Sequence, residues 1–402
     1  MKSTLKVKIL MIITAIAFLF FFSNDFGLID VEKTSIITAI AIDRESDEYL
    51  VTAQIAVPEA IDTNSENLKT QLSGKGCTVG AAIKDFGDIS GWFPKLAFCN
   101  LIILGNSLTD TNVIECLDYF AKTLRMQDSA LVALSEKSAK DLLSISTPLD
   151  NISAFALQKI MLKTRGFDKD VASTDIKEFC SGHYSKNGSS YMPIIKTVPS
   201  GDDSESTSSS SNSSNSSQGG QSSDSSNKKQ LFDARTTALF KNGKMVGKLN
   251  EDLTLMFNAL TSNFNGTTIP VKGVEHNDGT KSNYLLSVIT SKPKIEMSVD
   301  DKINLDISLS LYCQIIDHAV DGSKEALSQN VKLPSELKEK TEKMLTENIN
   351  ELISTSIKTG CDFMRFSDKL YRHHHKHYNK FKDNYLDNLS LTVSVNVNGQ
   401  KM

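Results

Sequence analysis

The first half of the chain alternates between short apolar runs typical of strands and apolar residues at helical spacing, and this predicts alternating strands and helices. Residues 35–43 and 48–57 are rich in β-branched side chains and flank the charged tetrapeptide RESD, a pattern that predicts two strands joined by a tight turn. Residues 96–105 and 130–135 are continuous apolar runs, which are typical of strands buried on both faces.

Helical patterns lie between these predicted strands. Residues 77–89 predict a short helix that Thr78 caps, and residues 138–145 predict another. Residues 109–124 are amphipathic, and one face of that helix carries Val113, Leu117, Phe120 and Leu124. Strands and helices at this spacing predict a mixed sheet with helices packed on it.

Strict alternation predicts strands of a different kind in the second half. Residues 236–250 predict a hairpin whose turn is the pair Asn242-Gly243. Residues 302–312 alternate, and the side chains that face one way are Ile303, Leu305, Ile307, Leu309 and Leu311. Residues 389–397 repeat the alternation. Two half-exposed strands of this kind predict an antiparallel sheet with one covered face.

A long helix provides the cover for that sheet. Pro334 and Ser335 open it, Gly360 ends it, and its apolar stripe consists of Leu345, Ile349, Leu352 and Ile353. Helices on one face of an antiparallel sheet make this half α+β. We therefore expect an α+β protein in which mixed and antiparallel sheets are flanked by α-helices, in two or three domains with one N-terminal helix.

A polar stretch divides the chain. Residues 200–227 are dominated by Ser, with Gly, Asn and Asp, so burial there cannot offset the entropy lost on ordering. The stretch either joins two folded parts or loops out from between two strands. We predict a disordered linker over 199–230, an N-terminal α/β part over 30–198 and a C-terminal α+β domain over 231–400.

The N-terminal segment has the pattern of a signal or an anchor. Three lysines within residues 2–8 precede an apolar run, Ile9–Phe22. No small-residue cleavage site follows, and residues 1–33 contain no cysteine that could carry a lipid. We expect residues 1–24 to form an uncleaved signal anchor or transmembrane helix, with a buried core helix as the alternative. The lysines place the N-terminus in the cytosol and the rest of the chain outside.

Composition excludes some classes of function. With 402 residues, of which 40% are hydrophobic and 23% charged, the chain can bury two or three cores. A net charge of −4 and 7% aromatic residues give no nucleic-acid footprint. The six cysteines form no C-x-x-C pair, and several lie in apolar runs. Buried free thiols are therefore expected, although an outside location permits disulfides.

No motif of a known catalytic class stands out. The sequence has no H-E-x-x-H, no G-x-S-x-G and no Walker loop. The glycine-rich segment 74–80 lacks the Walker ending and is interpreted as a turn that leads into a helix. We predict no catalytic residue, no cofactor and no metal site.

The one unusual cluster is basic and lies in residues 365–382. If this segment is one helix, a single face forms a surface contact made of Arg365, Lys369, Arg372, Lys376 and Lys380. His373 and His377 have the i, i+4 spacing that can hold zinc, but no third ligand lies nearby at metal spacing. A face turned to anionic lipid headgroups is the alternative to a solvated face.

In order and spacing, these landmarks resemble the Ger(x)C family, the C-subunit type of nutrient germinant receptors in spore-forming bacteria. The family opens with a polar lead-in, a strand, Ile-Asp and a hairpin, and its C-terminal half has a Phe-Lys-x-x-Lys-hydrophobic-Gly hairpin and an Asp-hydrophobic-Gly-Phe region. The segments similar to the family's are residues 30–60, 74–86, 96–108, 138–155, 238–254 and 360–378. The chain departs from the family at Phe22, Ser23 and Asn24, where a lipobox cysteine is usual.

The resemblance implies a non-enzymatic, membrane-tethered subunit that couples nutrient sensing to germination through protein contacts. Its expected partners are the integral-membrane and A-type subunits of a germinant receptor, at the spore inner membrane or the cell membrane, with the folded part on the extracytoplasmic side. An extracytoplasmic solute-binding protein serving a transporter is the alternative, although a Ser-rich tether is a poor hinge for cleft closure. The absence of hydrolase motifs disfavours a secreted hydrolase.

Overall fold

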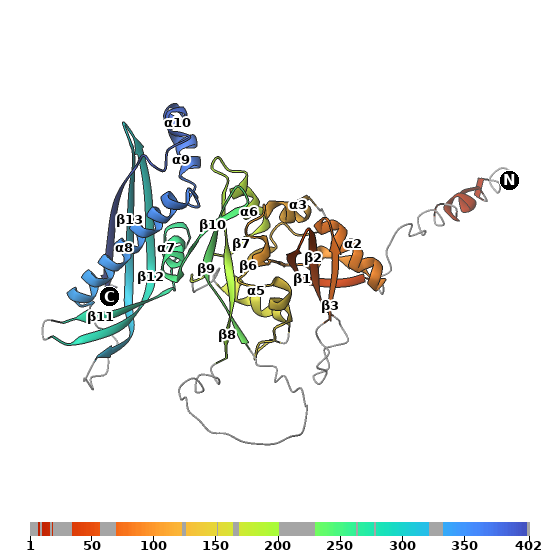
Figure 1. Cartoon of the computed structure of the whole chain (residues 1–402), viewed down its shortest axis with the longest axis horizontal. Coiled ribbons are helices and arrows are strands. Elements are labelled where there is room, and N and C mark those ends of the chain that lie inside the picture. Colours follow the sequence, from red (N-terminus) through yellow and green to blue (C-terminus); the bar gives the residue numbers. More distant parts are fainter. Residues whose placement is uncertain are drawn as a thin grey trace, which may run out of the picture.

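The computed structural model describes residues 7–8, 10–16, 18, 34–56, 70–122, 126–150, 152–163, 169–200, 230–262, 264–276, 279–320 and 333–399. These residues form two β-sheets with helices packed against both (Figure 1). The architecture is α+β, as predicted.

The first sheet is parallel at its centre and antiparallel at both edges. Its strands are β1 (Thr34–Glu45), β2 (Glu48–Ala56), β3 (Thr70–Gly76), β4 (Phe93–Lys95), β5 (Leu101–Leu104), β6 (Leu131–Ser135), β7 (Thr174–Asp175), β8 (Ser189–Pro199), β9 (Gln230–Lys241) and β10 (Lys244–Leu249). The main order is β10-β9-β8-β6-β5-β1-β2-β3, and the β1–β5, β5–β6 and β6–β8 pairs are parallel. The predicted β1–β2 hairpin is confirmed.

Helices cover both faces of this sheet. They are α2 (Val79–Ser90), α3 (Ile114–Lys122), α4 (Ala139–Ser144), α5 (Ser153–Lys163) and α6 (Ile176–His183), with short 3-10 turns η3 (Leu96–Phe98) and η4 (Asn106–Leu108). Alternation along β1 divides the core: Ile40 and Ile42 pack with α2, α3 and α6, whereas Ala39 and Ala41 pack with α4 and α5. Thr78 caps α2 by accepting the Ala81 N–H, as predicted.

The prediction of one strand over residues 96–105 is wrong at its start. Only Leu101–Leu104 are a strand, and η3 precedes it. The reason lies in β1, which pairs in parallel with β4 and then with β5. The tight turn of η3 carries the chain from the first of these pairings to the second.

The second sheet has the order β11-β12-β13-β14. Its strands are β11 (Thr268–Glu275), β12 (Lys281–Val299), β13 (Ile303–Val320) and β14 (Leu389–Gly399), and the helices that follow the first sheet are α7 (Glu251–Thr261), α8 (Ser335–Thr359), α9 (Phe366–His373) and α10 (His375–Phe381). The predicted inward face of β13 and the predicted stripe of α8 are both buried in one core. Gly360 ends α8 with a φ of 63°, as predicted.

The expectation that the two alternating strands belong to an antiparallel sheet is wrong for the pair itself. β13 and β14 run parallel, with Ile303 opposite Leu389 and Cys313 opposite Gly399. The chain between them contains the 25-residue α8, which is about 37 Å long and returns the chain to the start of β13. A helical crossover of this kind joins parallel strands.

The Ser-rich stretch leaves and re-enters the first sheet at neighbouring positions. β8 and β9 pair antiparallel, with Pro199 opposite Gln230, so the stretch loops out from between two strands. Residues 201–229, where disorder is predicted, lie outside the described residues. The β9–β10 hairpin therefore belongs to the first sheet, and the sheets divide the chain later than the predicted linker. The domain boundaries themselves remain a prediction.

Most of the predicted anchor, residues 1–24, also lies outside the described part. The described residues within it, 7–8, 10–16 and 18, are helical. Among the described residues, no helix is long and apolar enough to cross a membrane.

Candidate functional site

The first sheet meets the end of α8 at residues 360–368, which we call the joint. The Cys361 thiol donates a hydrogen bond to the Phe240 carbonyl of β9, with Sγ and O 3.3 Å apart. The Asp362 N–H donates to the Ser189 hydroxyl of β8 at 2.8 Å. Two strands of the first sheet thus hold the end of the helix that covers the second sheet.

Asp362 is the centre of the joint, and the residue is only 1% exposed. Its carboxylate accepts the N–H groups of Phe366 and Ser367 at 2.8 and 2.7 Å and the hydroxyl of Tyr385 at 2.8 Å. Burial raises the pKa of Asp362, and these hydrogen bonds act in the opposite direction. The carboxylate therefore caps the first turn of α9 and fixes the segment before β14.

Aromatic side chains fill the space beside the joint. The rings of Tyr191 on β8 and Phe257 on α7 are 4.8 Å apart at 73°, and those of Phe257 and Phe363 are 5.6 Å apart at 78°. Edge-to-face pairs of this kind contribute about 0.5–1.5 kcal/mol each beyond their buried area. The rings come from β8, α7 and the joint, and their packing holds α7 between the two sheets, as Figure 1 shows.

A hollow of about 430 Å³ opens beside the joint, and we call it the basic hollow. It is lined by Leu260, Thr261, Ile295, Met364, Arg365, Asp368, Lys369, Arg372 and His373. Three of these side chains are Arg or Lys, and one is a carboxylate. Apolar side chains from α7, β12 and the joint complete the lining.

The start of α9 is docked onto α6 and the loop that follows it. Arg365 has a φ of 57° and a ψ of 41°, a left-handed conformation that costs a non-glycine residue about 1–2 kcal/mol. Its guanidinium donates to the Glu178 carbonyl at 3.4 Å and to the Ser181 hydroxyl at 3.5 Å. The Lys186 N–H donates to the Asp368 carboxylate at 3.4 Å. These contacts offset the backbone cost and fix one wall of the basic hollow.

Lys369 is a half-buried cation of the hollow. Burial lowers its pKa, and the charge of Asp362 partly opposes this shift. Within the described residues, no ion pair involves Lys369 or Arg372. The hollow therefore combines a partly desolvated ammonium group with an exposed guanidinium.

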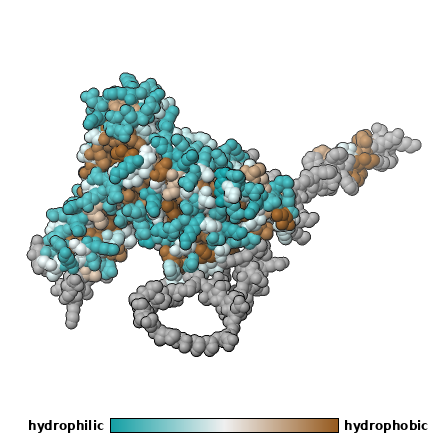
Figure 2. All heavy atoms as spheres, viewed as in Figure 1, coloured by the Kyte–Doolittle hydropathy of each residue, from teal (hydrophilic) through white to brown (hydrophobic). Residues whose placement is uncertain are grey.

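The basic cluster does not form one continuous helix, so the condition for a single cationic face is not met. The segment breaks at His374, with a φ of −127° and a ψ of 41°, into α9 and α10. The His374 ring is 3.0 Å from the Met297 carbonyl of β12, and this contact accompanies the break. Arg365, Lys369 and Arg372 consequently line the hollow, whereas Lys376 and Lys380 are exposed on α10. Figure 2 shows that the projecting end of the molecule formed by α9 and α10 is mostly hydrophilic.

The two histidines of the predicted cluster do not share a helix. His373 is the last residue of α9 and His377 lies in α10, so the helical i, i+4 relation does not hold. Across the described chain, no group of three metal-ligating side chains is close enough to hold an ion.

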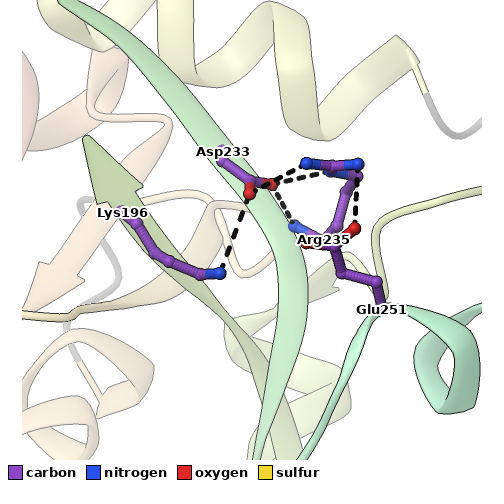
Figure 3. Close-up of polar contacts among 4 residues, drawn as sticks. All are labelled: Lys196, Asp233, Arg235 and Glu251. Atoms are coloured by element: carbon purple, nitrogen blue, oxygen red, sulfur yellow. Dashed lines mark hydrogen bonds and ion pairs between the residues drawn. The ribbon is translucent and has the colours of Figure 1, made fainter. Parts of the chain in front are cut away.

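A charge network at the other end of the β8–β9 pair went unpredicted. The Arg235 guanidinium binds both oxygens of Asp233, with Nε and Nη2 at 3.0 and 3.1 Å (Figure 3). Arg235 also pairs with Glu251 in the first turn of α7 at 2.9 Å, and Lys196 of β8 is 3.8 Å from Asp233. The network thus connects β8 and β9 with α7.

Two opposing effects set the pKa of Asp233. Burial raises it, but the hydrogen bonds from Arg235, together with the charges of Arg235 and Lys196, outweigh burial and lower the pKa overall. The hydrogen bonds to Asp233 raise the pKa of Arg235. Asp233 and Arg235 are two positions apart on one strand, and this spacing was the available signal for the pair.

All six cysteines are free thiols; four are buried, as expected, whereas Cys180 is half-buried and Cys77 is exposed. Burial raises the pKa of the thiols of Cys99, Cys116, Cys313 and Cys361 to about 12, and that of Cys180 to about 11. A raised pKa disfavours the reactive thiolate form of these five side chains.

Comparison with protein families matches both halves of the chain. Residues 28–197 match the family described as the spore germination protein N-terminal domain. Residues 235–400 match the family described as spore germination B3/GerAC-like, C-terminal. No curated protein gave a significant match.

Comparison with solved structures finds the crystal structure of the GerBC protein. That structure matches over 92% of this chain and 100% of its own chain, with a TM-score of 0.50 and 16% sequence identity. At this identity, the match concerns the fold.

Proposed function

We propose a receptor function for this chain on the premise that it belongs to the GerAC-like family of spore germination proteins. The family match over residues 28–197 and 235–400 carries the proposal. In this function the chain is a non-enzymatic subunit of a germinant receptor. It couples nutrient sensing to germination through contacts with integral-membrane and A-type subunits.

The joint supports action by contact more than action by cleft closure. Closure requires a hinge that absorbs changes in backbone angles. Here the connection between the sheets carries the hydrogen bonds from Cys361 to β9 and from the Asp362 N–H to β8, together with an edge-to-face ring cluster. A body fixed in this way presents constant surfaces to partners, whereas a solute-binding protein needs two parts that move.

Membrane tethering belongs to the same proposal. The apolar run Ile9–Phe22 with lysines before it suits an uncleaved anchor, with the folded part on the extracytoplasmic side. A tether confines the protein to a surface and raises its effective concentration near membrane partners. The spore inner membrane, or the cell membrane, is the proposed location.

Germination of spores that lack residues 8–22 tests the proposal. We expect loss of refractility to fail with nutrients and to remain normal with a non-nutrient trigger that bypasses the receptors. A variant that carries an unrelated transmembrane helix in place of residues 8–22 is the matched control, and it should restore the nutrient response. Normal germination of the deletion strain with every nutrient would contradict the receptor function.

The exposed cations of α10 are the proposed contact surface. Reversing the charge of Lys376 and Lys380 together should slow nutrient germination without unfolding the protein, because both side chains are exposed. The control is the same reversal at Lys244 and Lys248, which are exposed on β10. Equal effects of the two double variants would show that net charge, and not this surface, matters.

A further inference from the structure

The basic hollow has the composition of a binding site for an amphiphilic anion. Its lining combines the cations Arg365, Lys369 and Arg372 with the apolar side chains of Leu260, Ile295 and Met364. Small-molecule sites are concave, mostly apolar and equipped with a few placed polar groups, and their volumes are about 300–1,000 Å³. The hollow, at about 430 Å³, falls in this range.

Cations outnumber carboxylates at the hollow, and Lys369 is partly desolvated. Asp368 is the one carboxylate in the lining, and the buried carboxylate of Asp362, outside the lining, also acts on Lys369, so three cations face two carboxylates. Lys369 is half-buried, and Arg372 is exposed at the rim. An ammonium group that has lost part of its hydration gains more from a bound oxyanion than a fully hydrated one does, because the local dielectric is lower.

The walls of the hollow are held in place before any ligand arrives. Arg365 is fixed by its bonds to α6, and the Asp362 carboxylate caps the first turn of α9. Fixed walls lower the entropic cost of binding, because fewer side chains must be ordered.

We propose that the basic hollow binds the carboxylate or phosphate group of a small amphiphilic molecule, with Lys369 and Arg372 on the oxyanion and the apolar part against Leu260, Ile295 and Met364. The ligand class is an oxyanion on a short apolar body. This inference does not depend on the receptor function, since binding can be measured on the isolated full-length protein.

The test uses 4-fluorophenylacetate as the probe and 4-fluorobenzylamine as the matched cation, both followed by fluorine NMR line broadening with the full-length protein. We expect the anion to bind with millimolar or better affinity and the amine not to bind. The variants Lys369→Met and Arg372→Gln should each weaken binding of the anion about tenfold, the loss expected for one charge-assisted hydrogen bond.

Matched controls remove a charge outside the hollow. Lys376→Met and Lys380→Gln on α10 make the same charge changes and should alter the affinity less than about twofold, the effect of one exposed charge at a distance. Circular dichroism and thermal unfolding of each variant show whether it is folded. Arg372 is exposed, so Arg372→Gln keeps the test valid if Lys369→Met fails to fold.

Two sources of the oxyanion are distinguished by competition. Dihexanoyl phosphatidylglycerol displaces the probe if the hollow accepts a lipid headgroup, and dihexanoyl phosphatidylcholine serves as its neutral control. Failure of the phosphatidylglycerol to compete assigns the hollow to free small anions. Equal binding of anion and amine overturns the proposal, as does anion binding that none of the hollow variants weakens, or the absence of binding by both the probe and the short-chain lipid.

Discussion

Two aspartates lie where the first sheet meets helices of the second half, Asp362 at the joint and Asp233 near the start of β9. Asp362 is buried and takes its three donors from the neutral groups of Phe366, Ser367 and Tyr385. Asp233 is partly buried and takes its donors from Arg235, with Lys196 further away. The pKa of Asp362 is raised, and that of Asp233 is lowered.

Two differences account for the opposite signs: Asp362 is almost fully buried with neutral donors, whereas Asp233 is only partly buried and its main donor, Arg235, is charged. Neutral donors stabilise the anion of Asp362 but do not compensate for lost hydration. Full positive charges on Arg235 and Lys196 do so for Asp233. The Asp362 carboxylate therefore fixes the geometry of the joint, although burial destabilises its ionised form. The Asp233 carboxylate stays ionised, and its contribution to stability depends on ionic strength.

The largest effect is expected from Asp362→Ala. The free energy of unfolding should fall by about 3 kcal/mol, because two buried N–H groups and one hydroxyl lose their acceptor. Chemical denaturation followed by far-UV circular dichroism measures it. Asp362→Asn keeps one acceptor oxygen and should lose less. A loss below about 1 kcal/mol for the alanine variant would mean that water or local movement satisfies these donors.

A smaller loss, about 1 kcal/mol, is expected from Asp233→Ala at low ionic strength. Salt screens partly exposed charges, so this loss should shrink in high salt, while that of Asp362→Ala should not. Chemical denaturation of both variants at two salt concentrations measures how far each loss in the free energy of unfolding depends on salt. Equal salt sensitivity of the two variants would remove the distinction between a charged and a neutral donor set.

The pH dependence of stability should have opposite signs at the two sites. Because the pKa of Asp362 is raised, the free energy of unfolding of the wild type should exceed that of Asp362→Asn most at pH values below 3.8, the ordinary pKa of Asp. The excess should shrink as pH rises. The lowered pKa of Asp233 means that its advantage over Asp233→Asn is complete above 3.8 and is lost as pH falls. Unfolding measured from about pH 3 to pH 7 gives both slopes. Slopes of the same sign would contradict the assignment.

The smallest effect is expected from Lys196→Met, at most about 0.3 kcal/mol, because a single amine at this distance from the carboxylate makes no short hydrogen bond and contributes little. Its Nζ is 3.8 Å from Asp233, whereas Arg235 binds the same carboxylate through two nitrogens. Arg235→Met is the control and should cost nearly as much as Asp233→Ala. If the lysine and arginine variants cost the same, the network acts as a diffuse charge and not through a defined pair.

Local patterns predicted individual elements well, because each depends on a few neighbouring residues. Thr78 marks the cap of α2, and Gly360 marks the end of α8. The alternation in β13 predicts which side chains face the core. It carries no information about the direction of the neighbouring strand, and so the parallel β13–β14 pair was missed.

Features that depend on distant residues could not be predicted. Strand β12 was not predicted because Pro293 and its flanking lysines interrupt the apolar pattern. Proline is tolerated there because β11 pairs only with residues 281–287 of β12, so Pro293 lies in a part of β12 that forms an edge of the sheet. Lys369 and Arg372 were predicted as part of a surface contact, but the hollow also needs Leu260 and Ile295 from other elements. Asp362 is bonded to Tyr385 and to Ser189 of β8, both distant in sequence. The residues next to Asp362 in the sequence therefore could not predict its structural role.

The pairing of Pro199 with Gln230 has a consequence for how the chain can vary and be engineered. Because these residues are neighbours in a sheet, whatever joins them begins and ends at a fixed short separation. Doubling the length of such a connection costs only about 0.6 kcal/mol in closure entropy. Insertions and deletions here are therefore nearly neutral for the fold, and a fluorescent reporter or an affinity tag placed between β8 and β9 should leave both sheets intact.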